Sequence, residues 1–229
     1  MNKILSYEDM EINVIQSTLS PDHIIKVACA ITQKQDLWDD GIPNPKLIKY
    51  LFTANHTSPF EHCYITFLIK NVSRSFLAQI TRHRMGSFTA ASQHYQKYDS
   101  YPDILDPQMV NMKTVRTFLS DVNSMYDYLT SLLLLPKEEA RQVLSNSKAV
   151  NILWTVNARS LINFFNQRLC KRNVQEMHMF ATKLKEICIN WFPDLFVLVG
   201  PDCETLGGCT QGKMKAEVCR NENIPNFKR

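Results

Sequence analysis

Glycine is scarce in this chain, with only 6 glycines among 229 residues, against an average of about 7%. Neither the GxGxxG pattern of dinucleotide-binding folds nor the GxxxxGK[ST] phosphate loop occurs. Long apolar runs are also missing, because the strongest one, residues 132–135, is far below the ~20 residues of a membrane span. The sequence therefore excludes both glycine-rich phosphate loops and predicts no membrane segment.

A strong charge imbalance is absent too. The 26 Lys and Arg residues against 22 Asp and Glu give a net charge of +4, which is too small to indicate a nucleic-acid or membrane partner. The hydrophobic share of 45% and the charged share of 21% are typical of folded globular proteins. At roughly 150 residues per domain, this length favours a single domain.

The seven cysteines are an odd number, and residues 1–16 contain no apolar core of a secretory signal. We therefore expect a reducing, cytoplasmic location. Cys203, Cys209 and Cys219 show no CxxC spacing, and His56 and His62 have too few further ligands nearby, so no metal site is predicted. A cysteine nucleophile stays open, although none lies beside an obvious base.

Hydrophobic spacing predicts a mixed α/β fold. A strand over residues 60–72 is apolar on both faces, which favours a central place in a sheet, and a brief strand is expected at 152–156. Residues 200–229 collect Pro, Gly and charges and are expected to pack loosely. Helical periodicity predicts helices near residues 20–31, 45–53, 74–84 (capped by Ser73), 112–134, 137–144, 157–171 and 173–191.

Two polar features stand out. Arg82, His83 and Arg84 end an apolar helix, with Ser92 and His94 downstream. Cations in a last helical turn also favour the helix dipole, so a simple C-terminal cap is the alternative to a ligand site.

The second feature is Arg168, which at about 100° per residue falls between Leu161 and Phe164 in the apolar sector of its helix. A guanidinium there needs a carboxylate, carbonyls or a planar ligand. A structural salt bridge to a distant glutamate is the alternative to a functional role. A separate polar stripe, which either contacts a ligand or is simply solvated, comprises Arg159, Asn163 and Asn166.

Residues 82–94, RHRMGSFTAASQH, resemble the RHRxxSxxxxSxR signature of the flavin-dependent thymidylate synthases. Residues 154–168 look like the second conserved block of that family, and residues 60–62, Gln79 and Arg141 match in order. The resemblance covers roughly residues 20–195.

This resemblance implies an α/β (α+β) fold with a central sheet flanked by helices, in a single domain that assembles as a homotetramer. It implies a catalytic domain over residues 1–199 and a tail over 200–229. The implied reaction transfers a one-carbon unit from methylenetetrahydrofolate to C5 of deoxyuridylate, with FAD as cofactor and NADPH as reductant, and gives thymidylate.

The resemblance also assigns roles to residues of this chain. Arg168 would be catalytic, because the family activates the pyrimidine by an arginine that polarises the ring rather than by an added cysteine. The residues implied to hold FAD are His56, Ser58, Arg82, His83, Arg84, Met85, Asn157, Arg159 and Asn163. The residues implied to hold the nucleotide are Gln79, Arg82, Ala91, Ser92, Gln93, His94, Arg141 and Arg168.

Two positions depart from the family pattern. His94 replaces the final arginine of the signature, and Ala90 stands where the family usually has Glu or Gln. A neutral imidazole offers one donor where a guanidinium offers a charged fork. The sequence does not decide whether Lys148 or another cation compensates.

These departures keep two alternatives open. One is a related flavin-dependent methyl- or hydroxymethyltransferase that acts on another pyrimidine nucleotide. The other is a non-catalytic flavin- or nucleotide-binding module, against which the joint retention of Gln79, Arg141 and Arg168 argues.

Overall fold

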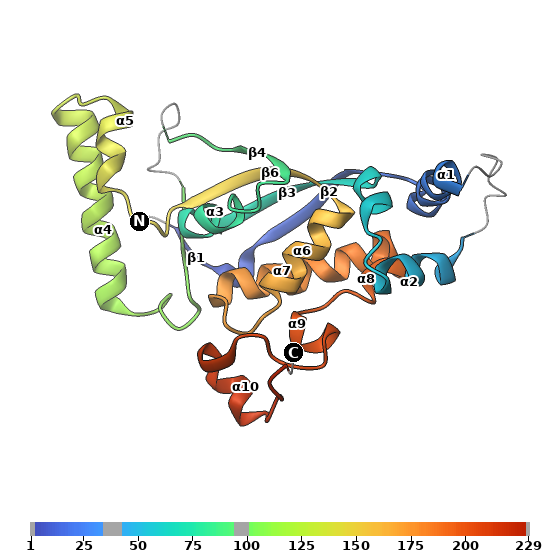
Figure 1. Cartoon of the computed structure of the whole chain (residues 1–229). Coiled ribbons are helices and arrows are strands. Elements are labelled where there is room, and N and C mark those ends of the chain that lie inside the picture. The colour runs from blue at the N-terminus through green and yellow to red at the C-terminus, as the bar shows by residue number, and fades with distance from the viewer. Residues whose placement is uncertain (1–2, 34–42, 94–100, 228–229) are drawn as a thin grey trace. The chain divides into compact units, whose positions relative to one another are not determined.

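The structure is a computed structural model that describes residues 3–33, 43–93 and 101–227. It has the mixed α/β architecture that the sequence predicts (Figure 1). The chain divides into two compact units. The first unit comprises Met1–Asn13 and Phe67–Trp154, and the second comprises Val14–Thr66 and Thr155–Arg229.

The larger sheet has four strands in the order β2-β3-β6-β4. These strands are β2 (Glu11–Ser17), β3 (Tyr64–Ser73), β6 (Ala149–Asn157) and β4 (Gly86–Ala90). The predicted central position of the β3 strand is confirmed, since it lies between β2 and β6. Its predicted start at residue 60 is wrong, because Pro59 lies in the first turn of a short 3-10 helix, η2 (Ser58–His62).

The first unit also holds a small parallel sheet. Its strands β1 (Ile4–Ser6) and β5 (Asp103–Leu105) pair with Ile4 opposite Asp103. The 3-10 helix η1 (Tyr7–Asp9) follows β1.

The helix α3 (Arg74–Ile80) begins as predicted, because the Ser73 hydroxyl accepts a 2.9 Å hydrogen bond from the Phe76 amide. It ends four residues before the predicted end at residue 84, and β4 then forms within the predicted loop. Phe88 of β4 stacks on Trp154 with ring centroids 5.7 Å apart. Pairing with a neighbouring strand and aromatic packing of this kind stabilise a strand even in a short segment that contains Ser and Thr.

The predicted long helix is α4 (Lys113–Asp127), which continues as a π-helical turn, η4 (Tyr128–Leu132). The predicted short helix is α5 (Lys137–Ala140), followed by the 3-10 helix η5 (Arg141–Val143). Figure 1 shows α4 and α5 side by side.

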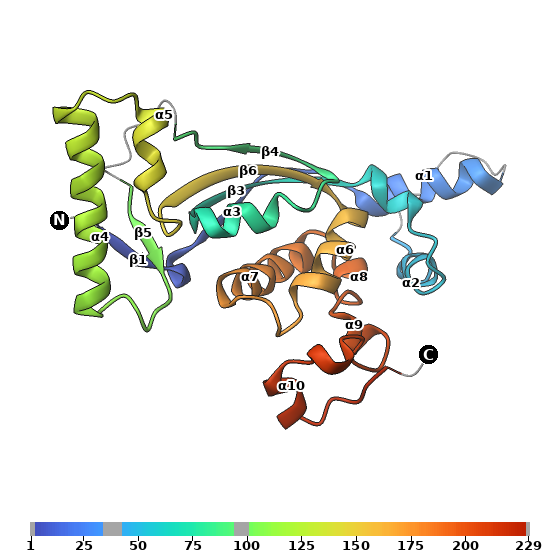
Figure 2. The same ribbon diagram turned by 60° about the vertical axis from the view of Figure 1, so that its left-hand side comes forward.

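The second unit is mainly helical. Its helices include α1 (Pro21–Gln33), α2 (Pro45–Thr53), α6 (Ala158–Arg168), α7 (Gln175–Trp191) and α8 (Pro193–Phe196). The four longer ones were predicted, but α6 ends at Arg168 rather than at residue 171, and α7 begins at Gln175 rather than at residue 173. Figure 2 shows α6, α7 and α8 packed together. Phe164 and Phe180 meet edge to face in that core.

Residues beyond 200 form three short pieces: α9 (Asp202–Thr205), η6 (Gly212–Met214) and α10 (Glu217–Asn221). Most side chains there are exposed, but Cys209 and Cys219 are buried. Across the described ranges, no helix combines the length and the apolar character that crossing a bilayer requires.

Candidate active site

In the first unit, the basic segment lies where α3 ends. The amides of Arg82 and His83 donate to the carbonyls of Gln79 and Ile80, which turns the chain out of the helix. Arg82 and Arg84 are exposed, and no carboxylate among the described residues pairs with either guanidinium. Two such cations suit a phosphate-bearing ligand, although the helix dipole also favours them.

The rest of this segment runs through β4 into residues 91–93. The Ala91 amide donates to the Asn151 carbonyl (3.0 Å), and Arg74 Nη1 donates to the Ala91 carbonyl (3.3 Å). Ser92 is half-buried and Gln93 is buried. The backbone of Ala91, the first of these expected nucleotide contacts, is thus held through both its amide and its carbonyl.

Arg74, which the sequence analysis did not single out, contacts the backbone of an expected nucleotide residue, Ala91. A cation at the first position of a helix interacts unfavourably with the helix dipole. An arginine at this position is therefore the sequence feature that could have drawn attention to Arg74. His94, the departure from the family signature, lies outside the described residues.

Two further basic residues of the first unit have protein partners. Arg141 is half-buried and its Nε donates to the Glu138 carbonyl (3.1 Å). Lys148 is fully buried, and its Nζ donates to Asp103 Oδ2 (3.0 Å) and to the Tyr101 carbonyl (3.1 Å). Breaking such a buried pair costs about 3–5 kcal/mol, so Lys148 is not available to compensate for His94.

In the second unit, the start of α6 carries three of the expected cofactor residues. Asn157 caps the helix, with its Oδ1 accepting from the Ser160 amide at 2.8 Å. Arg159 forms an ion pair with Glu61, while Asn163 Oδ1 accepts a long 3.4 Å hydrogen bond from Gln167. The resemblance assigned no role to Glu61. Its partner Arg159 lies 98 residues away, so no local sequence pattern predicts this ion pair.

The polar stripe on α6 is not simply solvated. Arg159 has its ion pair, and the Asn166 amide nitrogen, in its favourable orientation, donates to the carbonyls of Gly200 (2.8 Å) and Ile162 (3.2 Å). Asn166 therefore ties α6 to the start of the tail.

Arg168 has the partner that its position in the apolar sector requires. It is half-buried, and its Nη1 donates to Asn173 Oδ1 (3.1 Å). Asn173 is itself held, because its Nδ2 donates to the carbonyls of Gln167 (2.8 Å), Cys170 (2.9 Å) and Arg168 (3.3 Å). The amide oxygen of Asn173 thus helps to orient this guanidinium.

The second unit also contains a cavity of about 900 Å³. His56 and Ser58 both line it, with Tyr50 and His62, and the Tyr50 and His56 ring centroids lie 6.0 Å apart. Its apolar side comes from α1, and its volume lies within the ~300–1,000 Å³ range of small-molecule sites. This cavity therefore brings together His56 and Ser58, two of the residues expected to hold the cofactor.

The expected site residues are divided between the units. Those in the first unit are Gln79, Arg82, His83, Arg84, Met85, Ala91, Ser92, Gln93 and Arg141, and those in the second are His56, Ser58, Asn157, Arg159, Asn163 and Arg168. Within the parts of the chain that are described, no three His, Cys, Asp or Glu side chains are placed to hold a metal ion.

The raised pKa values of five cysteines disfavour these thiols as thiolate nucleophiles. Burial, followed by the nearby charge of Asp22, raises the pKa of Cys63 to about 12. Burial is also the largest cause of the raised pKa of Cys29, Cys188, Cys203 and Cys219. A raised pKa leaves the thiol protonated and unreactive near neutral pH.

Comparisons with known proteins agree with the sequence match. The family model described as "Thymidylate synthase complementing protein" matches residues 13–194. A flavin-dependent thymidylate synthase of Nitratidesulfovibrio vulgaris is 33% identical over 177 residues, which cover 72% of each chain. One of Clostridium tetani is 28% identical over 232 residues, which cover 90% of this chain and 92% of the relative.

Solved structures show the same fold. The UMP/dUMP methylase PolB of Streptomyces cacaoi, bound with 5-Br dUMP, superposes with a TM-score of 0.73 at 22% identity, covering 85% of this chain and 95% of that one. The flavin-dependent thymidylate synthase ThyX of Helicobacter pylori, complexed with FAD and dUMP, gives 0.70 at 21% identity, covering 83% and 99%. Since the family model spans most of its length and a relative is 33% identical, the chain belongs to the flavin-dependent thymidylate synthase family.

Proposed function

We propose that this protein is a thymidylate synthase that transfers a one-carbon unit from methylenetetrahydrofolate to C5 of deoxyuridylate, with FAD as cofactor and NADPH as reductant. Membership of the family supports this reaction, because the relatives that are named for it match up to 90% of this chain. The Helicobacter pylori structure was obtained with FAD and dUMP, the two molecules that the proposal requires.

The described residues fit FAD. Arg82 and Arg84 present guanidinium groups that no described carboxylate neutralises, which suits a diphosphate. The cavity lined by Tyr50, His56 and Ser58 suits a planar aromatic group. When bound, FAD carries the reducing equivalents from the nicotinamide to the transferred carbon.

For the nucleotide, we propose Gln79, Arg141 and the backbone and side chains of residues 91–93 as binding groups. The Ala91 backbone is held by Asn151 and Arg74. A preset backbone lowers the entropy cost of ordering these groups around a substrate.

The orientation of Arg168 by Asn173 is the single observation that carries the catalytic proposal. Arg168 acts by polarising the pyrimidine ring, because a guanidinium stays charged at neutral pH and presents its donors in a plane. Donors that are oriented before the reaction stabilise developing charge without reorganisation.

The test is to incubate the full chain with FAD, NADPH and methylenetetrahydrofolate, together with deoxyuridylate, deoxycytidylate or uridylate in separate reactions. Mass spectrometry of the product is expected to show thymidylate from deoxyuridylate. A protein that binds flavin and all three nucleotides but forms no product contradicts the proposal.

A second candidate function follows from Ala90 and His94. These changes remove contacts expected at the nucleotide, and PolB, which shares the fold, is named for action on both UMP and dUMP. His94→Arg is expected to tighten deoxyuridylate binding by roughly 1–2 kcal/mol, the scale of a charge-assisted hydrogen bond. Unchanged or weaker binding, or a hydroxymethylated product, favours the related enzyme that acts on another nucleotide or delivers another group.

We also propose a homotetramer. The end of η4 and the residues after it expose a run of apolar side chains, with Leu132 at 69% and Leu134 at 79% exposure. Soluble monomers rarely leave large apolar patches uncovered. Light scattering on the flavin-loaded protein is expected to give four chains per particle, and a monomer contradicts this proposal.

Two further proposals concern the domain boundary and the cellular compartment. We propose that residues 1–199 form the catalytic domain and 200–229 a tail, which agrees with a family match that ends at residue 194. We place the reaction in the cytoplasm because all seven cysteines are free, as a reducing compartment favours. Cell fractionation checks the compartment.

A further inference from the structure

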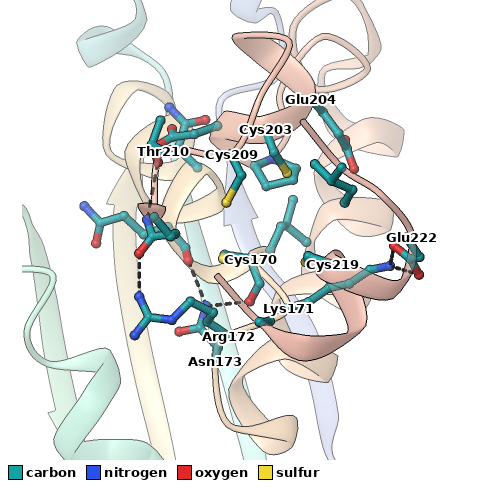
Figure 3. Close-up of a pocket in the computed structure, with 18 residues that line it drawn as sticks. Cys170, Lys171, Arg172, Asn173, Cys203, Glu204, Cys209, Thr210, Cys219 and Glu222 are labelled. Carbon is teal, nitrogen blue, oxygen red and sulfur yellow. Dashed lines mark hydrogen bonds and ion pairs between the residues drawn. The ribbon is translucent and has the colours of Figure 1, made fainter. Parts of the chain in front are cut away.

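Four of the seven cysteines surround one cavity of about 540 Å³ in the second unit (Figure 3). Cys170 comes from the loop after α6, and Cys203, Cys209 and Cys219 come from the tail. Cys170 is distant in sequence from the other three, which lie on separate short segments of the tail, so the fold of the tail brings the four to one place.

The tail backbone makes tight turns at its glycines. Four of the six glycines of the chain lie here, and Gly207 and Gly212 adopt φ values of +72° and +54°, which other residues rarely adopt. A side chain at Gly208 would come within 2.7 Å of the Phe227 backbone nitrogen. The Phe227 amide donates to the Cys209 carbonyl (3.0 Å), so the chain end folds back against the segment that presents Cys209.

Cys170 is presented by a well-held loop. The Asn173 side chain donates to three carbonyls of residues 167–170, including that of Cys170. The tail reaches this loop through polar contacts at the surface, including the ion pair of Lys171 and Glu222, whose side chains are 42% and 45% exposed. Exposed pairs of this kind contribute little to stability.

The tail therefore lacks an obvious source of stability. Its helices have five residues or fewer, and segments below about 40 residues rarely bury enough apolar surface to hold a fold. Small folds of this size depend on disulfides or on a structural metal ion. All seven cysteines are free, which favours a metal ion.

We propose that Cys170, Cys203, Cys209 and Cys219 together bind one Zn²⁺ ion that holds the tail against the loop after α6. Each thiol gives its proton to solvent and forms one Zn–S bond of about 2.3 Å, which completes the tetrahedral four-cysteine set of structural zinc sites. Among the described side chains no three ligands already converge on one point. The proposal therefore requires the thiols to move inward as the ion binds, and the bound ion then fixes the folded tail against the loop after α6.

The first test is the metal content of the full chain, expressed with added zinc and measured by inductively coupled plasma mass spectrometry. We expect about one Zn²⁺ per chain, as a structural site requires. Cys209→Ser and Cys170→Ser are expected to weaken binding at least about tenfold. Cys29→Ser is the matched control and keeps the metal, because Cys29 lies outside this cavity. A chain without zinc, or equal zinc in all three variants, overturns the proposal.

A second measurement uses the unchanged protein, so it does not depend on the folding of a variant. Thiol alkylation followed by peptide mass spectrometry is expected to show the four cysteines protected with zinc and modified after a chelator is added. Cys29 is expected to react equally in both states. Labelling of the four cysteines that ignores the chelator overturns the proposal, as does a disulfide between any two of them in the protein as isolated.

Discussion

The two arginine-bearing segments differ in how the protein holds them. In the first unit, Arg82 and Arg84 project into solvent beyond α3, with no carboxylate partner among the described residues. In the second unit, Arg168 is half-buried and oriented by Asn173, which three carbonyls hold in place. A charge that binds a flexible diphosphate needs no preset direction, whereas a charge that polarises one ring does. The difference indicates that the first segment binds and the second takes part in the chemistry.

The largest effect is expected for Arg168→Lys. Lysine keeps the charge but loses the planar fork, so kcat should fall by roughly 100- to 1,000-fold, as when a preorganised donor is removed. FAD binding should stay unchanged. The measurement is steady-state kinetics beside a flavin titration, with the exposed neighbour Arg172→Lys as control. Equal activity of the two variants would remove the distinction between the segments.

Asn173→Ala separates orientation from charge. The substitution leaves Arg168 in place but removes the oxygen that directs it, and a small misplacement costs up to about 100-fold in rate. We expect kcat to fall while KM for deoxyuridylate changes little. Gln167→Ala, on the exposed face of the same helix, serves as the control. A change in KM alone would mean that Asn173 has a binding role instead.

Arg82→Ala and Arg84→Ala test the binding segment. Each is expected to weaken FAD affinity by about 1.5–3 kcal/mol, the scale of a hydrogen bond to a charged group, and the loss should shrink as salt is added. Thermal stability should hardly change, because both side chains are exposed. Flavin fluorescence titration measures the affinity, with Arg116→Ala on α4 as control. A large loss of stability would indicate that these residues serve as helix caps.

The smallest effect is expected for Glu61→Gln. Its ion pair with Arg159 joins side chains that are 43% and 51% exposed, so the free energy of unfolding should fall by no more than about 1 kcal/mol. Denaturant unfolding at low and high salt measures this change. A loss that persists at high salt would show that Glu61 acts through more than charge.

Much of the helical framework could be predicted from the sequence, because spacing and caps are local. Ser73 caps α3 as expected, and the periodicity of α6 places Arg168 in the apolar sector. Contacts made by the fold could not be predicted in this way. Asn173 was predicted to begin a helix but lies in the loop before α7, and β4 forms a strand because it pairs with a neighbouring strand.

The cysteine cluster shows the same limit. The spacing of Cys203, Cys209 and Cys219 matches no metal motif, and Cys170 is more than thirty residues away in the sequence. Only the path of the tail places all four around one cavity. Spacing rules recognise ligands that share a hairpin or a helix, whereas these thiols come from different segments.

The central claim is that this chain replaces the C5 hydrogen of deoxyuridylate through an oriented arginine. The most direct measurement is tritium release from deoxyuridylate labelled at C5, with FAD, NADPH and methylenetetrahydrofolate present. The unchanged protein should release tritium as thymidylate forms, and flavin-loaded Arg168→Lys should release almost none. Release at the same rate by both proteins, or none by an unchanged protein that binds flavin and nucleotide, would contradict the account.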